Sequence, residues 1–381
     1  MTPLRVRGRA VVAAALLLAA CGGDDPEPGT VRFALTDAPA CGFDEVYVAI
    51  ERIRVHRSAD ANEHSLGWTD LRLDPVRRID LLKLGNGVLE ELGQLSLPAG
   101  RYAQLRLVLA ANTGSPAANA VVPGDGEAVA LDIAAAQGGI RVAHAFSVTE
   151  RRTTDVLFDF DACRSVAPAG SAGYALRPVV RAVPRDGASI TGYVEAPGAT
   201  VSAQRNGAVV RATQADANGR FVIAFLDPAA SPFDVVLTAP GRATAVVAAV
   251  PVGGSAGAEL SRIDSPIGLP TATERTAGGT VGPTAARGTA RVRAVQLIGS
   301  AGQVEVAATH ANTGFGSYSL ALPAAQPRLA AFSTRLPLSF SAAGSAGQYL
   351  LEAAAQGYAP QVQSVSVANA AATWNPSLVR Q

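Results

Sequence analysis

One cysteine near the N-terminus stands in a context typical of covalent lipid attachment. Cys21 ends the run Leu18-Ala19-Ala20-Cys21-Gly22-Gly23, whose small residues suit a peptidase that draws an extended chain into a narrow site. Three arginines and then the eleven apolar residues Ala10–Ala20 precede it, too few for the ~20 that span a bilayer. We expect residues 1–20 to be a lipoprotein signal peptide and Cys21 to be the lipidated first residue. The alternative is an ordinary signal peptide with a chance cysteine.

The residues after Cys21 are expected to form a solvated tether. Residues 21–29 continue as Gly-Gly-Asp-Asp-Pro-Glu-Pro-Gly and offer no apolar side chain to bury. Fatty acyl chains such as palmitate would anchor the protein stably, because each buried CH₂ contributes about 0.8 kcal/mol. By the sorting pattern of such proteins, Gly22 in place of aspartate favours the outer membrane.

The other two cysteines, Cys41 and Cys163, form an even pair once Cys21 is assigned to lipid. In an oxidising compartment such a pair favours a disulfide. It would close a loop of ~120 residues, worth at most about 4–5 kcal/mol on the loop-entropy estimate. Two buried free thiols or two metal ligands are the alternatives, although the paired spacing of a zinc site is missing.

Three acids lie at alternating positions along one expected strand. Asp155, Asp159 and Asp161 would share the face opposite the apolar residues between them. Together with Asp37 their carboxylates could hold Ca²⁺. The alternative is the solvated face of a half-buried strand. Asp37 also precedes Ala38-Pro39, where its carboxylate would accept backbone N–H bonds in a turn.

Other patterns with chemical potential are weaker. Gly253–Gly257 fits the Gly-x-Ser-x-Gly pattern of a hydrolase but runs into linker rather than a helix. The histidines lack the spacing of a metal-binding pair, and they are His56, His64, His144 and His310. The side chains that could stack on a sugar, with core packing as the alternative, are Trp68, Trp374, Tyr193 and Tyr358.

The charge balance excludes a strongly basic surface. The chain has a formal charge of +1, and loss of the three arginines in residues 1–20 leaves the mature chain at −2. Nucleic acid is therefore not an expected partner. The membrane, reached through the lipid, is the expected partner, and no cofactor is predicted.

Residues 30–185 are expected to form one β-rich domain. Apolar residues alternate from Val46 to Ile50, slip at Glu51-Arg52 and then resume, which indicates a bulge. Val88–Leu95 is the one segment for which a short helix is predicted. Period-two runs separated by turn signals favour an antiparallel sandwich.

Four segments of this domain carry a dense set of motifs. They are Leu35–Asp44, Gly67–Leu71, Arg78–Gly87 and Phe158–Cys163. Together they resemble the domain of unknown function 4382, a family of bacterial lipoprotein and envelope domains. The resemblance implies a secreted β domain with no established activity. Cys41 and Cys163 both fall inside these motifs, which is compatible with their pairing.

The rest of the chain contains a weak internal repeat. The segments Ile190–Val194, Ala199–Gln204, Asn218–Ile223 and Phe233–Arg242 recur as Gly279–Gly282, Ala290–Val295, Phe315–Leu320 and Tyr349–Tyr358. The first copy, residues 188–252, resembles the carboxypeptidase regulatory-like (transthyretin-like) sandwich in its Ile-Thr-Gly-Tyr-Val start and its Asn-Gly-Arg-Phe strand. The second copy, residues 279–381, departs more and has extra sequence around Pro323 to Pro337. Residues 253–278 are expected to be a linker.

The sequence thus predicts an all-β chain of three tandem β-sandwich-like modules behind a lipoprotein signal peptide. No motif assigns a catalytic residue. The leading expectation is a lipid-anchored, non-enzymatic envelope protein that binds carbohydrate or protein, or has a structural role. The alternative is an enzyme or enzyme accessory acting on envelope polysaccharide or peptide, with its site in residues 30–185. Clustered acids with shifted pKa values in a cleft would favour that alternative.

Overall fold

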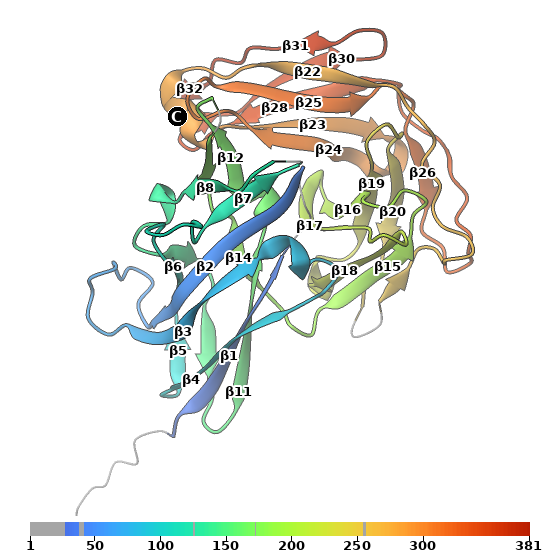
Figure 1. The fold of residues 1–381 in the computed structure, drawn as a ribbon. Helices are drawn as coiled ribbons and strands as arrows, with labels where there is room; N and C mark the ends of the chain where they lie inside the picture. The colour runs from blue at the N-terminus through green and yellow to red at the C-terminus, as the bar shows by residue number, and fades with distance from the viewer. Residues whose placement is uncertain (1–26, 38–41, 125, 172, 254–256) are drawn as a thin grey trace, which may run out of the picture.

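The computed structural model shows three β modules in which strands dominate, and the predicted all-β class is confirmed (Figure 1). The residues that it describes are 27–37, 42–124, 126–171, 173–253 and 257–381. Module one (residues 29–183) lies at the end where the chain enters, module three (residues 274–380) lies at the opposite end, and module two (residues 188–269) lies beside both. None of the helices in the described part of the chain could span a membrane.

Module one is the largest of the three. Its strands are β1 (Gly29–Asp37), β2 (Phe43–His56), β3 (Thr69–Asp80), β4 (Glu90–Leu97), β5 (Gly100–Tyr102), β6 (Gln104–Leu109), β7 (Ala120–Pro123), β8 (Val129–Asp132), β9 (Ile140–Val142), β10 (Phe146–Val148), β11 (Thr153–Phe160), β12 (Val166–Ala169), β13 (Gly173–Leu176) and β14 (Val180–Val183). Its short helices are η1 (Leu81–Leu84), η2 (Ala134–Ala136) and α1 (Ala162–Ser165).

The two main sheets of module one share one apolar core. The smaller sheet has the order β14-β11-β1-β4, and the larger is built around the long strand β2, which pairs with β3, β6 and β7. Phe33 and Phe158 are fully buried in this core, with stacked rings whose centroids lie 6.0 Å apart. They come from β1 and β11, which pair in parallel. The acids of β11 are therefore carried by a strand inside a sheet.

Two local predictions for module one have opposite outcomes. The pairing register of β2 shifts between Ile50 and Arg52 against both of its neighbours, which confirms the bulge. The helix predicted over Val88–Leu95 is wrong, because β4 pairs antiparallel with β1 there. Gly93 within it has a φ of +134°, a backbone conformation outside the helical range. Strand pairing thus overrides the local helix propensity.

Modules two and three have the same strand plan. Module two has β15 (Ala188–Tyr193), β16 (Thr200–Arg205), β17 (Ala208–Gln214), β18 (Arg220–Leu226), η3 (Pro228–Ala230), β19 (Phe233–Thr238), β20 (Ala245–Val250) and β21 (Ala258–Glu259). Module three has β22 (Glu274–Thr280), η4 (Thr284–Thr289), β23 (Arg291–Ile298), η5 (Gly299–Ala301), β24 (Gly302–His310), β25 (Ser317–Pro323), β28 (Gln348–Ala354), β29 (Tyr358–Ala359), β30 (Gln361–Ser366), β31 (Ala372–Thr373) and β32 (Val379–Arg380).

The repeat predicted from the sequence is confirmed by the order of these strands. In module two the sheets run β18-β15-β21 and β17-β16-β19-β20, and in module three they run β25-β22-β31 and β24-β23-β28-β30. Each strand of one copy therefore has an equivalent in the other, including the short parallel strand that closes the smaller sheet.

The third module does not keep all of residues 279–381 to itself. Within the extra sequence, β26 (Arg328–Ala331) pairs in parallel with β20 of module two, and β27 (Ser341–Ala342) pairs with β26. Phe332, Leu338 and Phe340 pack against the core of module two. The extra sequence is thus a strand-bearing excursion that extends the sheet of its neighbour.

The linker predicted over residues 253–278 is also corrected. Leu260, Ile267 and Leu269 are buried in the core of module two, and β21 joins its smaller sheet. From Glu274 the chain is already in β22 of module three. Scattered Gly, Ser and Pro residues hide these few apolar anchors, because a short apolar segment with no periodicity gives a weak pattern.

Candidate functional site

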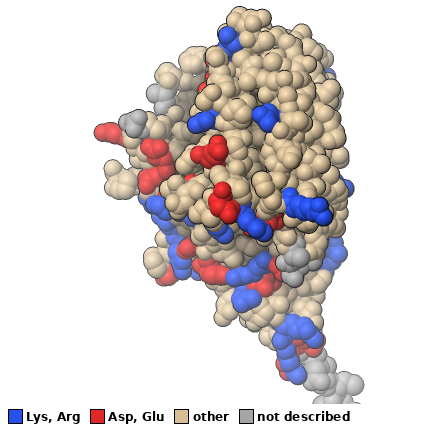
Figure 2. Space-filling model, turned by 90° about the vertical axis from the view of Figure 1, so that its right-hand side faces the viewer, with Lys and Arg blue, Asp and Glu red and all other residues tan. Residues whose placement is uncertain are grey.

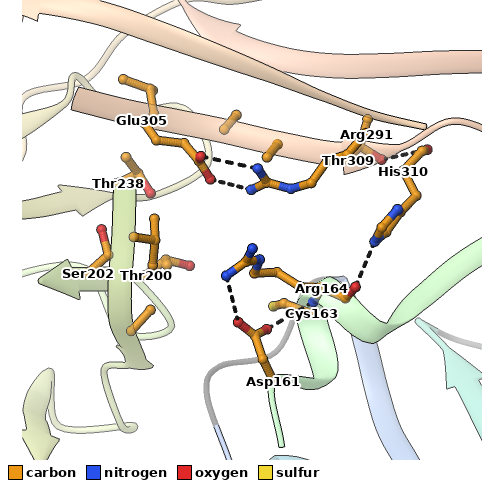
Figure 3. A pocket seen from close by; sticks show the side chains of 15 residues that line it. Asp161, Cys163, Arg164, Thr200, Ser202, Thr238, Arg291, Glu305, Thr309 and His310 are labelled. Atoms are coloured by element: carbon orange, nitrogen blue, oxygen red, sulfur yellow. Dashed lines mark hydrogen bonds and ion pairs between the residues drawn. The ribbon is translucent and has the colours of Figure 1, made fainter. Parts of the chain in front are cut away.

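A cavity of about 240 Å³ lies where the three modules meet (Figure 3). Helix α1 of module one, strands β16, β17 and β19 of module two, and strands β23 and β24 of module three form its walls. The ionisable side chains that line it, apart from cysteine, are Asp161, Arg164, Arg291, Glu305 and His310. A second hollow of about 210 Å³ shares three of these residues and Val209 with it.

Arg164 is placed in this cavity by the capped helix α1. The carboxylate of Asp161 accepts a hydrogen bond from the Arg164 backbone N–H at 2.9 Å, and Asp37 accepts one from Ala162 N–H at 2.8 Å. These bonds satisfy N–H groups that a helix start leaves without partners. The short helix ends one residue after Arg164, so its side chain extends toward the other modules.

The guanidinium of Arg164 is poorly matched by the protein. Its Nε is buried without a hydrogen-bond partner, and its ion pair with Asp161 is long, with 3.9 Å between Nη1 and Oδ2. Burial lowers the pKa of this guanidinium, with Asp161 acting in the opposite direction. A charged group without hydrogen bonds is costly when it is shielded from water. Arg164 therefore retains donor capacity for a ligand.

The other arginine in the cavity is already matched. Arg291 makes two hydrogen bonds to the carboxylate of Glu305, at 2.5 and 3.4 Å. Glu305 is fixed in turn, because its backbone N–H and C=O both bond the side-chain amide of Gln204 from module two. Figure 3 shows this pair on the wall facing Arg164.

Hydroxyl groups line the module-two wall of the cavity. Thr200 and Thr238 face the cavity from β16 and β19 (Figure 3). Within the described part of the chain, neither hydroxyl has a hydrogen-bond partner. Ser202 is engaged, since it accepts a bond from Gln204 Nε2 at 2.9 Å. Two free hydroxyls thus lie across from an undermatched guanidinium.

His310 closes the cavity beside α1. Its Nε2 lies 2.6 Å from the backbone oxygen of Arg164 and donates to it. Burial lowers the pKa of His310 from its ordinary value, with nearby Arg291 acting in the same direction. The ring is therefore neutral at pH 7 and serves as a fixed contact between modules one and three.

The buried His310 should make the protein sensitive to acid. Below the ordinary pKa of 6.5 the unfolded chain takes up a proton that the folded chain still excludes, so stability falls as the pH drops. Between pH 7.5 and 5.5 we expect the wild type to lose about 1 kcal/mol more unfolding free energy than His310→Gln. Urea unfolding of both proteins at the two pH values measures this difference, and equal losses would contradict the assignment.

The calcium site predicted from four acids is wrong. Within the described residues, no three or more His, Cys, Asp or Glu side chains are grouped so that they could hold a metal ion. Asp155 lies on the outer part of β11 and accepts two hydrogen bonds from Arg32, at 2.9 and 3.0 Å. Asp159 and Asp161 are buried, so the solvated-face alternative is also wrong for them.

The buried acids instead receive an arginine from module two. Arg211 of β17 is 4% exposed, and its Nη1 lies 2.9 Å from Asp159 Oδ2. The charges of Asp37 and Asp161 also favour its charged form, against the strong effect of burial, which lowers its pKa. Arg181 adds a second contact to Asp159, at 2.8 Å. We call Asp37, Asp159 and Asp161 the acidic socket.

Arg164 and Arg211 were both missed by sequence reasoning. Each is an isolated arginine, and neither lies in a motif whose spacing points to a partner. Arg211 follows the apolar pair Val209-Val210 in an otherwise ordinary strand pattern. A charged residue in such a strand is a weak signal of a buried ion pair, and the sequence does not name the partner.

The remaining predicted side chains are dispersed. Trp68 of module one lies beside Arg54, whose guanidinium is 4.8 Å from its ring, and its indole N–H donates to Asn62. Trp374 and Tyr358 pack against the core of module three. Cys163 lines the junction cavity. Cys21, Cys41 and Ser255 lie outside the described residues, so lipidation and the disulfide remain predictions.

Fold and site together define an all-β protein whose sandwich modules enclose a polar cavity at their junction. Residues 28–178 match the family described as "Domain of unknown function (DUF4382)". This confirms the resemblance seen in the first domain over most of module one. No curated protein matches the chain. A streptococcal ancillary pilin structure covers 92% of this chain and 99% of its own, with 8% identity and a TM-score of 0.18. That score is too low to indicate a shared fold.

Proposed function

We propose that the mature chain is a lipid-anchored, non-enzymatic protein of the bacterial envelope, at the outer membrane, that binds a small carboxylated and hydroxylated ligand in the junction cavity. An acidic monosaccharide is the ligand class that this chemistry fits. The observation that carries the proposal is the buried guanidinium of Arg164, which faces a cavity without a hydrogen bond of its own.

The chemistry of the cavity walls supports this ligand class. A carboxylate matches the planar fork of a guanidinium and forms strong charge-assisted hydrogen bonds with it. Thr200 and Thr238 can each donate to and accept from a sugar hydroxyl. Among the lining residues the only ring is that of His310, so recognition would rest on polar contacts rather than stacking.

The placement of the chain supports the anchored part of the proposal. The described chain begins at the lower end of the molecule in Figure 1, and module three lies at the far end. A lipid on Cys21 would therefore leave the junction cavity away from the membrane surface. The carboxypeptidase regulatory-like features of residues 188–252 belong to the same proposal, as a binding module by analogy only.

One observation favours the enzyme alternative. Asp161 lines the cavity, and burial raises its pKa, which is a common property of catalytic acids. Its carboxylate is, however, committed to the start of α1 and to Arg164. This commitment favours a positioning role for Asp161. Release of reducing ends from envelope polysaccharide by the wild type, lost in Asp161→Asn, would support an enzyme instead.

Calorimetric titration with sodium glucuronate tests the binding proposal on the mature lipidated chain in detergent. Wild type should bind glucuronate, and Arg164→Gln should weaken binding about tenfold or more, because a charge-assisted hydrogen bond is lost. Glucose, which lacks the carboxylate, and acetate, which lacks the hydroxyls, should bind more weakly than glucuronate.

Arg101→Gln is the matched control, since Arg101 is exposed on β5 of module one. It should bind as the wild type does. Thr200→Val provides a second test that leaves α1 intact, and it should also weaken binding. No heat with glucuronate, or equal affinity in Arg164→Gln and the wild type, would overturn the proposal.

A further inference from the structure

Equivalent edge strands of the two repeats are treated differently. In module two, β20 is followed in its sheet by the added parallel strand β26. In module three the equivalent strand β30 ends its sheet, and within the described residues β28 is its only partner. Five of the six residues of β20 are buried, whereas all six residues of β30 are exposed or partly exposed. The position closed in one repeat is open in the other.

The open edge lacks the features that normally discourage pairing. Natural edge strands carry charges, prolines or bulges that prevent association with other strands. The edge strand β4 has Glu90, Glu91 and a register shift opposite β1. Strand β30 reads Gln-Val-Gln-Ser-Val-Ser, with no charge and no proline.

The surroundings of β30 are also poor in charge. From Ser345 to Gln381 the only charged side chains are Glu352 and Arg380. The upper part of the face in Figure 2, where module three lies, is largely uncharged, whereas charged side chains gather lower down. Val362 of β30 is 58% exposed. An uncharged strand meets no like-charge repulsion from a copy of itself.

We propose that β30 is a dimerisation edge, at which the β30 strands of two copies of this chain pair antiparallel. Such a pair is self-complementary, because each strand gives the other the same backbone donors and acceptors across a two-fold axis. The larger sheet of module three then continues from one copy into the next. A pair of six-residue strands is a small interface, so the dimer forms reversibly and depends on concentration. This proposal is independent of the ligand in the junction cavity.

Cysteine crosslinking in intact membranes tests the proposal on the full chain. After oxidation, Ser364→Cys in the middle of β30 should give a disulfide-linked dimer on a non-reducing gel. Ser58→Cys, exposed in a loop of module one, is the matched control and should give little dimer. Equal crosslinking of the two variants would overturn the proposal.

Sedimentation equilibrium of the mature chain in detergent gives a second measurement without new cysteines. Val362→Lys should weaken the dimer about tenfold, because it places like charges on facing strands. Leu66→Lys, which changes a 95% exposed residue of module one, should leave the dimer unchanged. A wild-type chain that is monomeric at every concentration would contradict the assignment.

Discussion

Replacing Arg211 by methionine should lower the free energy of unfolding by about 3–5 kcal/mol. Arg211 is buried between modules one and two, and its partner Asp159 is fully buried. Methionine fills a similar volume but leaves the acidic socket with one positive charge fewer. Removal of one partner from a buried ion pair is strongly destabilising, because the remaining charge stays shielded from water.

Urea unfolding at pH 7 measures this change. Arg205→Met is the matched control, since Arg205 is exposed at the end of β16 in the same hairpin, and its effect should be within about 0.5 kcal/mol. The double variant Arg211→Met with Asp159→Asn should recover part of the loss, because the two residues are directly coupled. An Arg211→Met protein as stable as the control would show that the socket does not hold the modules together.

Replacing Cys21 by serine should remove nearly all of the protein from the membrane fraction. Serine cannot form the thioether that carries the lipid, so the variant should remain as unprocessed precursor or be released in soluble form. The wild type should remain with membranes after a salt wash, since acyl chains hold it by apolar burial rather than by charge. Fractionation followed by immunoblotting gives both the location and the size of the chain.

Gly23→Ala is the control for this experiment, because it changes the tether but keeps the cysteine. It should fractionate as the wild type does. Mature-sized Cys21→Ser protein in the membrane fraction would contradict the lipoprotein proposal. That result would leave the binding chemistry of the junction cavity untouched, so the two parts of the proposed function can fail separately.

Features set by local chemistry were predictable from the sequence. The bulge at Glu51-Arg52 follows from a slip in apolar alternation, because a register slip exchanges the two faces of a strand. The repeat could be read because equivalent strands retain similar apolar patterns, such as Phe221 in β18 and Tyr318 in β25. Both features lie within single strands or simple strand order.

Features that depend on a distant partner could not be predicted in the same way. The alternation of Asp155, Asp159 and Asp161 was read correctly, but it does not reveal what covers their face. Module two covers it with Arg211, and this replaces the expected metal or solvent. Likewise, Val88–Leu95 has a helix-compatible composition, and only its pairing with β1 makes it a strand. Strand β26 has its partner in a different module.

The junction cavity belongs to this second group. Arg164 and Thr200 are separated by 36 positions, and Glu305 lies more than one hundred residues further along. Each comes from a different module, so no spacing rule within one segment could connect them. Their convergence follows from the contacts of β16, β24 and α1 around the cavity.

A crystal structure of the mature chain grown with glucuronate tests the central claim most directly. The account predicts the ligand in the junction cavity, with its carboxylate within hydrogen-bond distance of the Arg164 guanidinium and a hydroxyl on Thr200 or Thr238. A cavity without ligand, with glucuronate bound elsewhere or Arg164 turned into a close pair with Asp161, would contradict it.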